Sequence, residues 1–306
     1  MDRKVRTELK GILVMAYGGP TSLADVEAYY THIRGGRKPS KEQMDDLVAR
    51  YKAIGGWSPL LETTGKQAAG LARALGPEGA RVYAGMKHSP PFIGDVVRRA
   101  SSEGVTELLC IVLAPHYSKM STGGYAKAVD EANASLTRKI RVTFVDSWYD
   151  NPALIAMWAE RVKEAARTVG DDSALVFSAH SLPERIIREG DPYRDQLLTT
   201  SRLVAEKSSW SNWTFAFQSQ SKTGEPWLGP DILDHLQALY DRGERRFISA
   251  PIGFVSDHLE ILYDIDVECR GWAEKRGAEL FRCRSPDDSE EMIVTLVDIA
   301  KRNGFA

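Results

Sequence analysis

The sequence predicts an α/β protein made of two similar Rossmann-like domains, each built around a parallel sheet. Short apolar strands alternate along the chain with amphipathic helical stretches, which is typical of βαβ units. The chain has 306 residues, about twice the length of a typical domain. The segment LVMAYGGP (13–20) is echoed by LVFSAHSLP (175–183) in the other half. We therefore expect one domain over residues 1–150 and a second over residues 151–306, with a cleft between them.

The expected strands are short apolar runs bounded by turn residues or charges. They cover residues 11–16, 80–85, 107–114, 141–145, 174–178, 214–218 and 246–250. The clearest helical segments carry apolar residues at helical spacing. They cover residues 41–53, 64–75, 91–102 and 153–168. Since polar and aromatic residues follow almost every strand, we expect the carboxyl ends of the two sheets to line the cleft.

Composition excludes several classes of protein. A net charge of -2 gives no basis for binding nucleic acid. There is no apolar run of about 18 residues, so we expect no integral membrane association, and residues 1–10 are too charged for a signal peptide. Cys110, Cys269 and Cys283 lack the spacing of a zinc site and are too few for the usual iron–sulfur cluster. We expect a protein of the reducing cytoplasm.

The most informative stretch is VFSAHSLP (176–183), which predicts a buried strand that stops at His180. Pro183 prevents the strand from continuing, so the imidazole is delivered to the carboxyl end of a sheet. An unperturbed histidine titrates near pH ~6.5 and can accept a proton at neutral pH. The alternative is a histidine that only caps the strand and satisfies a turn.

A second group of candidates is acidic. Glu260, Asp264 and Glu268 are spaced so that they would share one face of a helix after the strand at 246–250. Like charges at this spacing destabilise a helix by roughly 0.2–0.5 kcal/mol per pair, which a cation or a nearby base could offset. A histidine and a carboxylate on facing strand ends can take a proton or hold a divalent metal. The alternative is a solvated acidic face.

A third group is basic and consists of Arg34, Arg37, Lys38 and, further along the chain, Arg50. The first three lie on a glycine-containing loop that follows an aromatic-rich helix. Arginines in such a loop can bind carboxylates through paired hydrogen bonds. The alternative is a solvated helix end at which cations are favoured by the helix dipole.

Three ordered blocks in the second half resemble the ferrochelatase family, whose members insert ferrous iron into a porphyrin. They are VFSAHSLP with GDPY (190–193), QS (218–219) with PWLGP (226–230), and PIGFVSDHLE (251–260). The resemblance covers essentially the whole chain and implies a chelatase-like fold with a porphyrin cleft. It implies that His180 is the general base for the pyrrole protons or a ligand of the iron, and that Glu260 is the second ligand or a proton carrier. Asp264 and Glu268 would extend a path for metal or protons.

The first half resembles the soluble Gram-positive branch of that family, which acts on coproporphyrin III. Its landmarks here are MAYG (15–18), YYTHIR (29–34), RY (50–51), GGWSPL (55–60), KH (87–88) and Tyr125. The resemblance implies that the porphyrin contacts Tyr17, Arg34, Arg50, Tyr51, Ser58 and Tyr125. Tyr17 would lie on the ring face opposite His180, and the arginines would suit the four propionates of coproporphyrin III.

The resemblance also implies the other reaction partners. Coproporphyrin III and Fe²⁺ would be substrates in haem biosynthesis, with no prosthetic group and no iron–sulfur cluster. We expect a monomer without a membrane-associating tail. Three alternatives stay open: iron insertion into protoporphyrin IX, cobalt or nickel insertion into a related tetrapyrrole, and a tetrapyrrole carrier without activity. Cobalt and nickel chelatases typically use extra histidines near the metal, so Glu260 in the second position favours iron.

Overall fold

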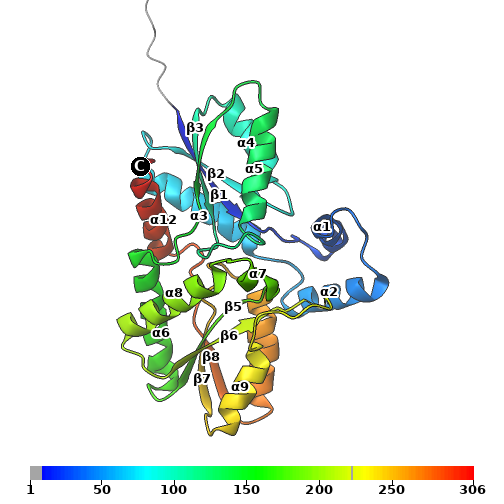
Figure 1. Ribbon diagram of the computed structural model, residues 1–306, viewed down its shortest axis with the longest axis vertical. Coiled ribbons are helices and arrows are strands. Elements are labelled where there is room, and N and C mark those ends of the chain that lie inside the picture. Colours follow the sequence, from blue (N-terminus) through cyan, green and yellow to red (C-terminus); the bar gives the residue numbers. More distant parts are fainter. Residues whose placement is uncertain (1–8, 222) are drawn as a thin grey trace, which may run out of the picture.

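The chain forms two parallel sheets that lie one after the other along the long axis of the molecule (Figure 1). The computed structural model describes residues 9–221 and 223–306. Most of the charged N-terminal segment that argues against a signal peptide, residues 1–8, lies outside the described residues. Within the described part of the chain, no helix is both long and apolar enough to cross a membrane.

Both sheets have four strands, and in both the strand that comes first in the chain is an inner strand. The first sheet has the order β2-β1-β3-β4 and the second the order β6-β5-β7-β8. Every pairing within them is parallel. The strands are β1 (Lys10–Ala16), β2 (Arg81–Met86), β3 (Glu107–Val112), β4 (Arg141–Val145), β5 (Ala174–His180), β6 (Trp213–Gln218), β7 (Arg246–Ala250) and β8 (Glu279–Arg282). The repeated order confirms the predicted fold class.

The strands differ from their predicted bounds where a neighbour extends or ends the ladder. β5 continues to His180 because that residue still pairs with Gln218 of β6, and β3 ends at Val112, two residues before the predicted end. β8 was not predicted at all. It is a short edge strand with no fully buried residue, so it has neither the length nor the apolar content of the other strands.

Helices surround both sheets. The longer ones are α2 (Lys41–Ala53), α3 (Leu60–Leu75), α4 (Ile93–Ser102), α5 (Gly123–Ser135), α6 (Pro152–Val169), α8 (Tyr193–Ser208), α9 (Ile232–Asp241) and α12 (Glu290–Arg302). The shorter ones are η1 (Leu23–Asp25), α1 (Val26–Ile33), α7 (Arg185–Arg188), α10 (Leu259–Leu262), η2 (Asp264–Cys269) and α11 (Arg270–Glu274). The predicted helix at 41–53 is confirmed as α2, where Ser40 and Gln43 form a capping box at its start. The other three predicted helices are confirmed as α3, α4 and α6 with small shifts at their ends.

The two halves share a hydrophobic core. One cluster of buried side chains includes Val14 from β1, Phe177 from β5 and Trp158 from α6. The C-terminal helix α12 packs against α6 and also against α3 of the first half (Figure 1). The division of the chain at residue 150 therefore stays a prediction, because the last helix of the second half contributes to the packing of the first.

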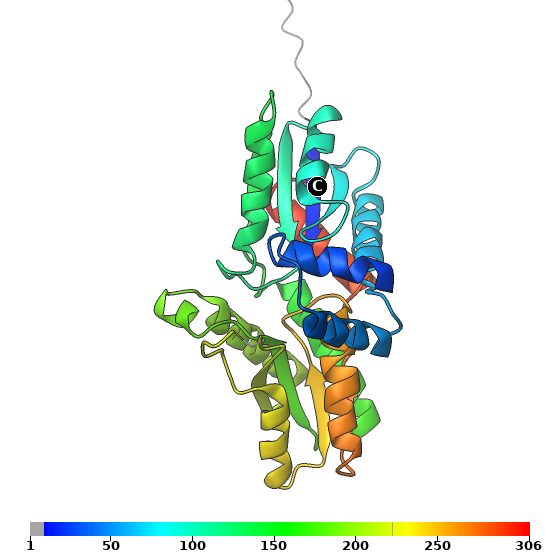
Figure 2. The ribbon, with the colours of Figure 1, turned by 90° about the vertical axis from the view of Figure 1, so that its right-hand side faces the viewer.

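The strand order determines where side chains can meet. In each sheet the order of the strands reverses at one point, between β1 and β3 in the first sheet and between β5 and β7 in the second. Ligands of open α/β sheets bind at the carboxyl ends of the strands at such a point. Tyr17 follows β1 directly and His180 ends β5. The helices α1 and α2 project from the body near the junction of the two halves (Figure 1), and in the turned view of Figure 2 these two blue helices lie in front of that junction.

Candidate active site

His180 is held at the end of β5 by its own backbone and by its neighbours. Its carbonyl accepts a hydrogen bond from the Tyr193 hydroxyl at 3.0 Å. Its ring Nδ1 hydrogen-bonds the Ser181 carbonyl, so Nδ1 carries a proton and Nε2 is directed elsewhere. These contacts give the imidazole a fixed orientation at the carboxyl end of β5.

Glu260 lies between two imidazoles. One carboxylate oxygen is 3.4 Å from Nε2 of His180, and the other is 3.5 Å from Nε2 of His258. The second ring is fixed in turn, because its Nδ1 lies 3.0 Å from the Ser256 carbonyl oxygen. We call His180, Glu260 and His258 the triad. The side chains of His180 and Glu260 are 29% and 34% exposed, so small molecules can reach it.

The triad has an ionisation state that differs from the one predicted. Burial lowers the pKa of His180, but the Glu260 carboxylate outweighs burial and raises this pKa to about 9. Burial disfavours the charged form of Glu260, yet His180 and His258 hold the pKa of its carboxyl well below the ordinary range. The prediction of an imidazole that titrates near neutral pH is therefore wrong for the unliganded protein, in which His180 is a cation at neutral pH.

Neighbouring strands hold the segment that carries Glu260. The Gln218 amide at the end of β6 donates to the Glu260 carbonyl at 2.7 Å and accepts a hydrogen bond from the Ser178 hydroxyl at 2.8 Å. Ser219 donates to the carboxylate of Asp264. These contacts hold the chain after β7 against the carboxyl end of the edge strand β6.

The acidic residues do not lie on one continuous α-helix, so that part of the prediction is wrong. α10 ends at Leu262, and the chain continues as the π-helix η2, in which the Glu268 amide bonds the Tyr263 carbonyl at 2.9 Å. Asp264 still lies close to its two acidic neighbours. Burial first, and then the charges of Glu260 and Glu268, raise the pKa of Asp264 to about 7. Burial also raises the pKa of Glu268.

Tyr17 faces this group from the first half of the chain. Burial first, and then the Glu260 charge, raise the pKa of Tyr17 well above its ordinary value. Its ring lies 4.4 Å from the ring of His88, and the Lys87 ammonium lies 5.8 Å from its ring centre. The His88 ring nitrogen Nδ1 is 3.1 Å from Nδ1 of His32. Tyr17 is 39% exposed, so its phenol is accessible from outside.

The other predicted porphyrin contacts are more dispersed. Tyr51 and Tyr125 are buried. Burial raises the pKa of each phenol, and the charge of Glu260 raises it further. Ser58 is buried before α3 and accepts the Leu60 amide at 3.4 Å. Whether these residues contact a porphyrin stays a prediction.

The two arginines differ from each other. Arg50 forms an ion pair with Asp46 at 3.1 Å and lies 5.2 Å from the Tyr263 ring, beside the acidic residues of η2. Its charge lowers the pKa of Asp264 and Glu268 against the effect of burial. Arg34 bonds the Arg37 carbonyl in its own loop at 3.3 Å.

Sequence reasoning missed His258 as a member of the site. The signal was present in the order DHLE (257–260), because a histidine two residues before the glutamate meets it when the chain between them is extended at the start of a helix. The backbone of His258 is extended there, ahead of α10. The argument that Glu260 replaces an additional histidine is therefore wrong, since this site has both. Among the described residues no three His, Cys, Asp or Glu side chains are arranged to hold a metal ion.

Comparison with known proteins agrees with the geometry. A family model described as Ferrochelatase matches residues 9–304. Coproporphyrin III ferrochelatase 2 of Bacillus cereus is 43% identical over 302 residues, which cover 95% of this chain and 93% of that protein. Coproporphyrin III ferrochelatase of Geobacillus thermodenitrificans is 44% identical over 298 residues, covering 94% of each. A protein of Herpetosiphon aurantiacus named Ferrochelatase is 43% identical over 289 residues, covering 92% of this chain and 95% of that protein.

Solved structures support the fold. The sirohydrochlorin chelatase SirB of Bacillus subtilis in complex with cobalt has a TM-score of 0.59 at 10% identity, covering 97% of this chain and 98% of that one. CbiX, described as the terminal enzyme of siroheme biosynthesis in denitrifying bacteria, has a TM-score of 0.57 at 14% identity, covering 96% and 99%. At these identities the likeness shows the chelatase-like two-sheet architecture alone.

Proposed function

This chain belongs to the ferrochelatase family, and we propose that it inserts Fe²⁺ into coproporphyrin III to give iron coproporphyrin III in haem biosynthesis. The observation that carries the proposal is the position of Glu260 between His180 and His258, with Tyr17 facing it from the other half. The substrate follows from the relatives, several of which are named coproporphyrin III ferrochelatases at 42% to 44% identity.

The ionisation of the triad suggests how protons leave the porphyrin. The free ring carries two pyrrole N–H protons, and both are released when one Fe²⁺ enters. Before metal arrives, Glu260 keeps His180 protonated. A dication that binds the Glu260 carboxylate cancels this effect, and burial then lowers the His180 pKa, so the imidazole releases its proton to solvent. It can then take up the two pyrrole protons one after the other and release each in turn. Asp264, with a pKa of about 7, can pass protons on at neutral pH.

The preference for coproporphyrin III rests on charge. Coproporphyrin III carries propionates where protoporphyrin IX has two vinyl groups, so it offers two additional carboxylates. A hydrogen bond to a charged group contributes roughly 1.5–3 kcal/mol net. Arg34 and Arg50 are the basic candidates for these bonds, with Ser58 and Tyr125 as neutral donors and Tyr17 and Tyr51 against the ring.

Three further expectations belong to this proposal: no prosthetic group, a cytoplasmic location and a monomer. Cys110, Cys269 and Cys283 are buried at separate places in the fold. Burial raises the pKa of Cys283 to about 12 and raises the pKa of the other two thiols as well. Protonated, separated thiols support the expectation that no iron–sulfur cluster is held.

The test is a steady-state assay with coproporphyrin III and protoporphyrin IX side by side under anaerobic Fe²⁺. We expect a higher kcat/KM for coproporphyrin III, and Arg34→Ala should reduce the difference, whereas the control Arg98→Ala, at an exposed position of α4, should not. A higher value for protoporphyrin IX would contradict the substrate. Faster insertion of cobalt or nickel, which the second histidine makes a fair alternative, would contradict the metal. Binding without metallation would favour a carrier.

A further inference from the structure

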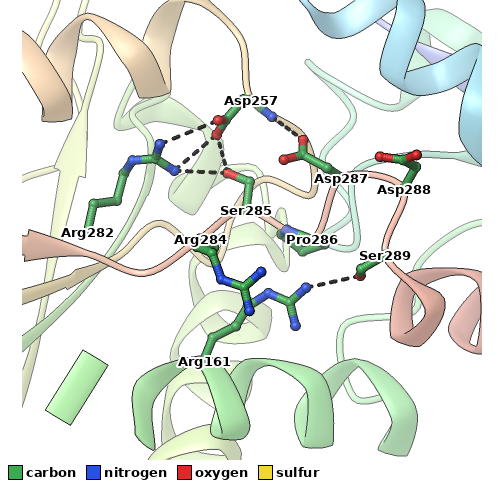
Figure 3. A pocket seen from close by; sticks show the side chains of 9 residues that line it. All are labelled: Arg161, Asp257, Arg282, Arg284, Ser285, Pro286, Asp287, Asp288 and Ser289. Carbon is green, nitrogen blue, oxygen red and sulfur yellow. Dashed lines mark hydrogen bonds and ion pairs between the residues drawn. The ribbon is translucent and has the colours of Figure 1, made fainter. Parts of the chain in front are cut away.

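One guanidinium joins two aspartates behind the triad. Arg282 ends β8, and its side chain is only 12% exposed. It donates to the Asp257 carboxylate at 3.0 and 3.4 Å and to the Asp266 carboxylate at 2.9, 3.0 and 3.1 Å (Figure 3 shows the Asp257 side). Every nitrogen of this guanidinium therefore bonds a carboxylate.

These two aspartates flank Glu260 in the chain. Asp257 immediately precedes His258, and Asp266 lies in the π-helix η2 that follows α10. Asp257 is fixed further, because Ser285 donates to its carboxylate and its amide donates to Asp287 at 2.8 Å (Figure 3). Arg282 therefore holds the segment that carries His258 and Glu260 at both of its ends.

We propose that Arg282 is a positioning residue that keeps the side chains of Glu260 and His258 at their places beside His180. This inference rests on the proposed function of the triad and adds the residue that maintains its geometry. Within the segment 257–266 only one short α-helical turn forms, at residues 259–262, and a π-helix follows from residue 264. A π-helical turn is rare and is frequently found at functional sites, and the bonds from Arg282 to Asp266 hold this one from outside.

The chemistry of arginine suits this role better than that of lysine. A planar guanidinium bonds two carboxylates at once in a fixed geometry, whereas an ammonium is a point charge without that directional pairing. The other arginines beside the same cavity, which has a volume of about 410 Å³, make different contacts (Figure 3). Arg284 bonds Glu164 at 2.8 Å, and Arg161 bonds Ser289 at 3.0 Å. Arg282 alone among these three arginines bonds the segment that carries Glu260.

The experiment compares Arg282→Lys with the matched control Arg284→Lys. Arg284 is two residues away and 73% exposed, and its ion pair lies outside the triad. We expect Arg282→Lys to lower kcat by roughly 10–100-fold, the usual effect of residues that orient metal-binding side chains, with little change in KM. Because Glu260 moves away from His180, the pKa of His180 should fall from about 9. Nuclear magnetic resonance titration of the protein without porphyrin measures this pKa.

Two outcomes would overturn the inference. One is an Arg282→Lys variant that is folded, with kcat and the His180 titration as in the wild type. If Arg282→Lys does not fold, Asp266→Asn replaces it, because this variant leaves the bonds between Arg282 and Asp257 in place. Asp266→Asn should then show the loss of kcat and the lower His180 pKa. Normal values in that variant contradict positioning. If the wild type does not metallate coproporphyrin III, the proposed function fails, whereas the titration still tests the role of Arg282.

Discussion

Glu260 sets the ionisation of both neighbouring histidines, because it is the anion that lies within 3.4 Å and 3.5 Å of their ring nitrogens. Its carboxylate also raises the pKa of Tyr17 across the site. The ionisable groups of the site are therefore coupled, and a change at one of them alters the protonation of the others. This coupling can be measured at single residues.

Replacing Glu260 with glutamine should convert His180 into a neutral imidazole. The variant removes the negative charge but keeps the burial, so the His180 pKa should fall from about 9 to below the ordinary value of about 6.5. Histidine ring signals followed against pH measure this directly, since the chain has only six histidines. Glu274→Gln, at an exposed position of α11, is the control. An unchanged His180 pKa in Glu260→Gln would refute the ion pair.

At the residue scale, the sequence predicted the identity of the central pair but not its environment. His180 and Glu260 could be found because a strand stop and a family motif point to them. His258 could not be found by spacing alone, because its approach to Glu260 depends on an extended backbone before α10. The raised pKa of His180 could not be predicted either. It depends on the short distance between His180 and Glu260, which lie about 80 residues apart in the sequence and are brought together only by the fold.

At the scale of elements, the important feature is the change from α10 to η2. The sequence predicted one acidic helix, because residues four apart lie close to one face of an α-helix and of a π-helix alike. Which hydrogen-bond ladder forms depends on outside contacts, such as the bond between Ser219 and Asp264. For the same reason the edge strand β8 was missed, whereas the apolar inner strands β1, β3 and β5 were predicted from their own residues.

The acidic residues should affect turnover in proportion to their distance from the triad. We expect Asp264→Asn to lower kcat by roughly 10–100-fold, as for groups that support a metal-binding side chain. Glu268→Gln should have a smaller effect, because Glu268 is further along η2 and more exposed than the buried Asp264. Steady-state rates for both variants beside Glu260→Gln measure the order. Equal effects at all three positions, or none, would favour a solvated acidic face.

At the scale of the whole molecule, the two halves are joined by buried polar contacts as well as by a shared core. His116 follows β3 in the first half, is 2% exposed, and its Nε2 lies 2.9 Å from the hydroxyl of Thr200 on α8. Burial lowers the pKa of His116 to about 3. Alternation of strands and helices predicted the architecture, but this contact depends on how the halves are docked, which local sequence does not determine.

Acid should destabilise the protein through His116. Its pKa is about 3 when folded and about 6.5 when unfolded, so between these values the unfolded chain binds more protons. The stabilising effect is full above the unfolded pKa and is lost as the pH falls toward the folded one, with a slope of up to about 1.4 kcal/mol per pH unit. Denaturant unfolding at several pH values should show a flatter dependence for His116→Gln. The control His235→Gln, at a half-buried position, should change the slope less. Equal slopes for wild type and His116→Gln would contradict this role.

The central claim is that His180 and Glu260 together insert the metal. Single-turnover metallation of coproporphyrin III under anaerobic Fe²⁺, with wild type and His180→Ala, tests it most directly. We predict that the wild type metallates the bound porphyrin and that His180→Ala is slower by roughly 10²–10⁴-fold, as expected for loss of a general base. Porphyrin binding and thermal stability should be retained in the variant. A folded His180→Ala protein that binds coproporphyrin III and metallates it at a rate near that of the wild type would contradict the claim.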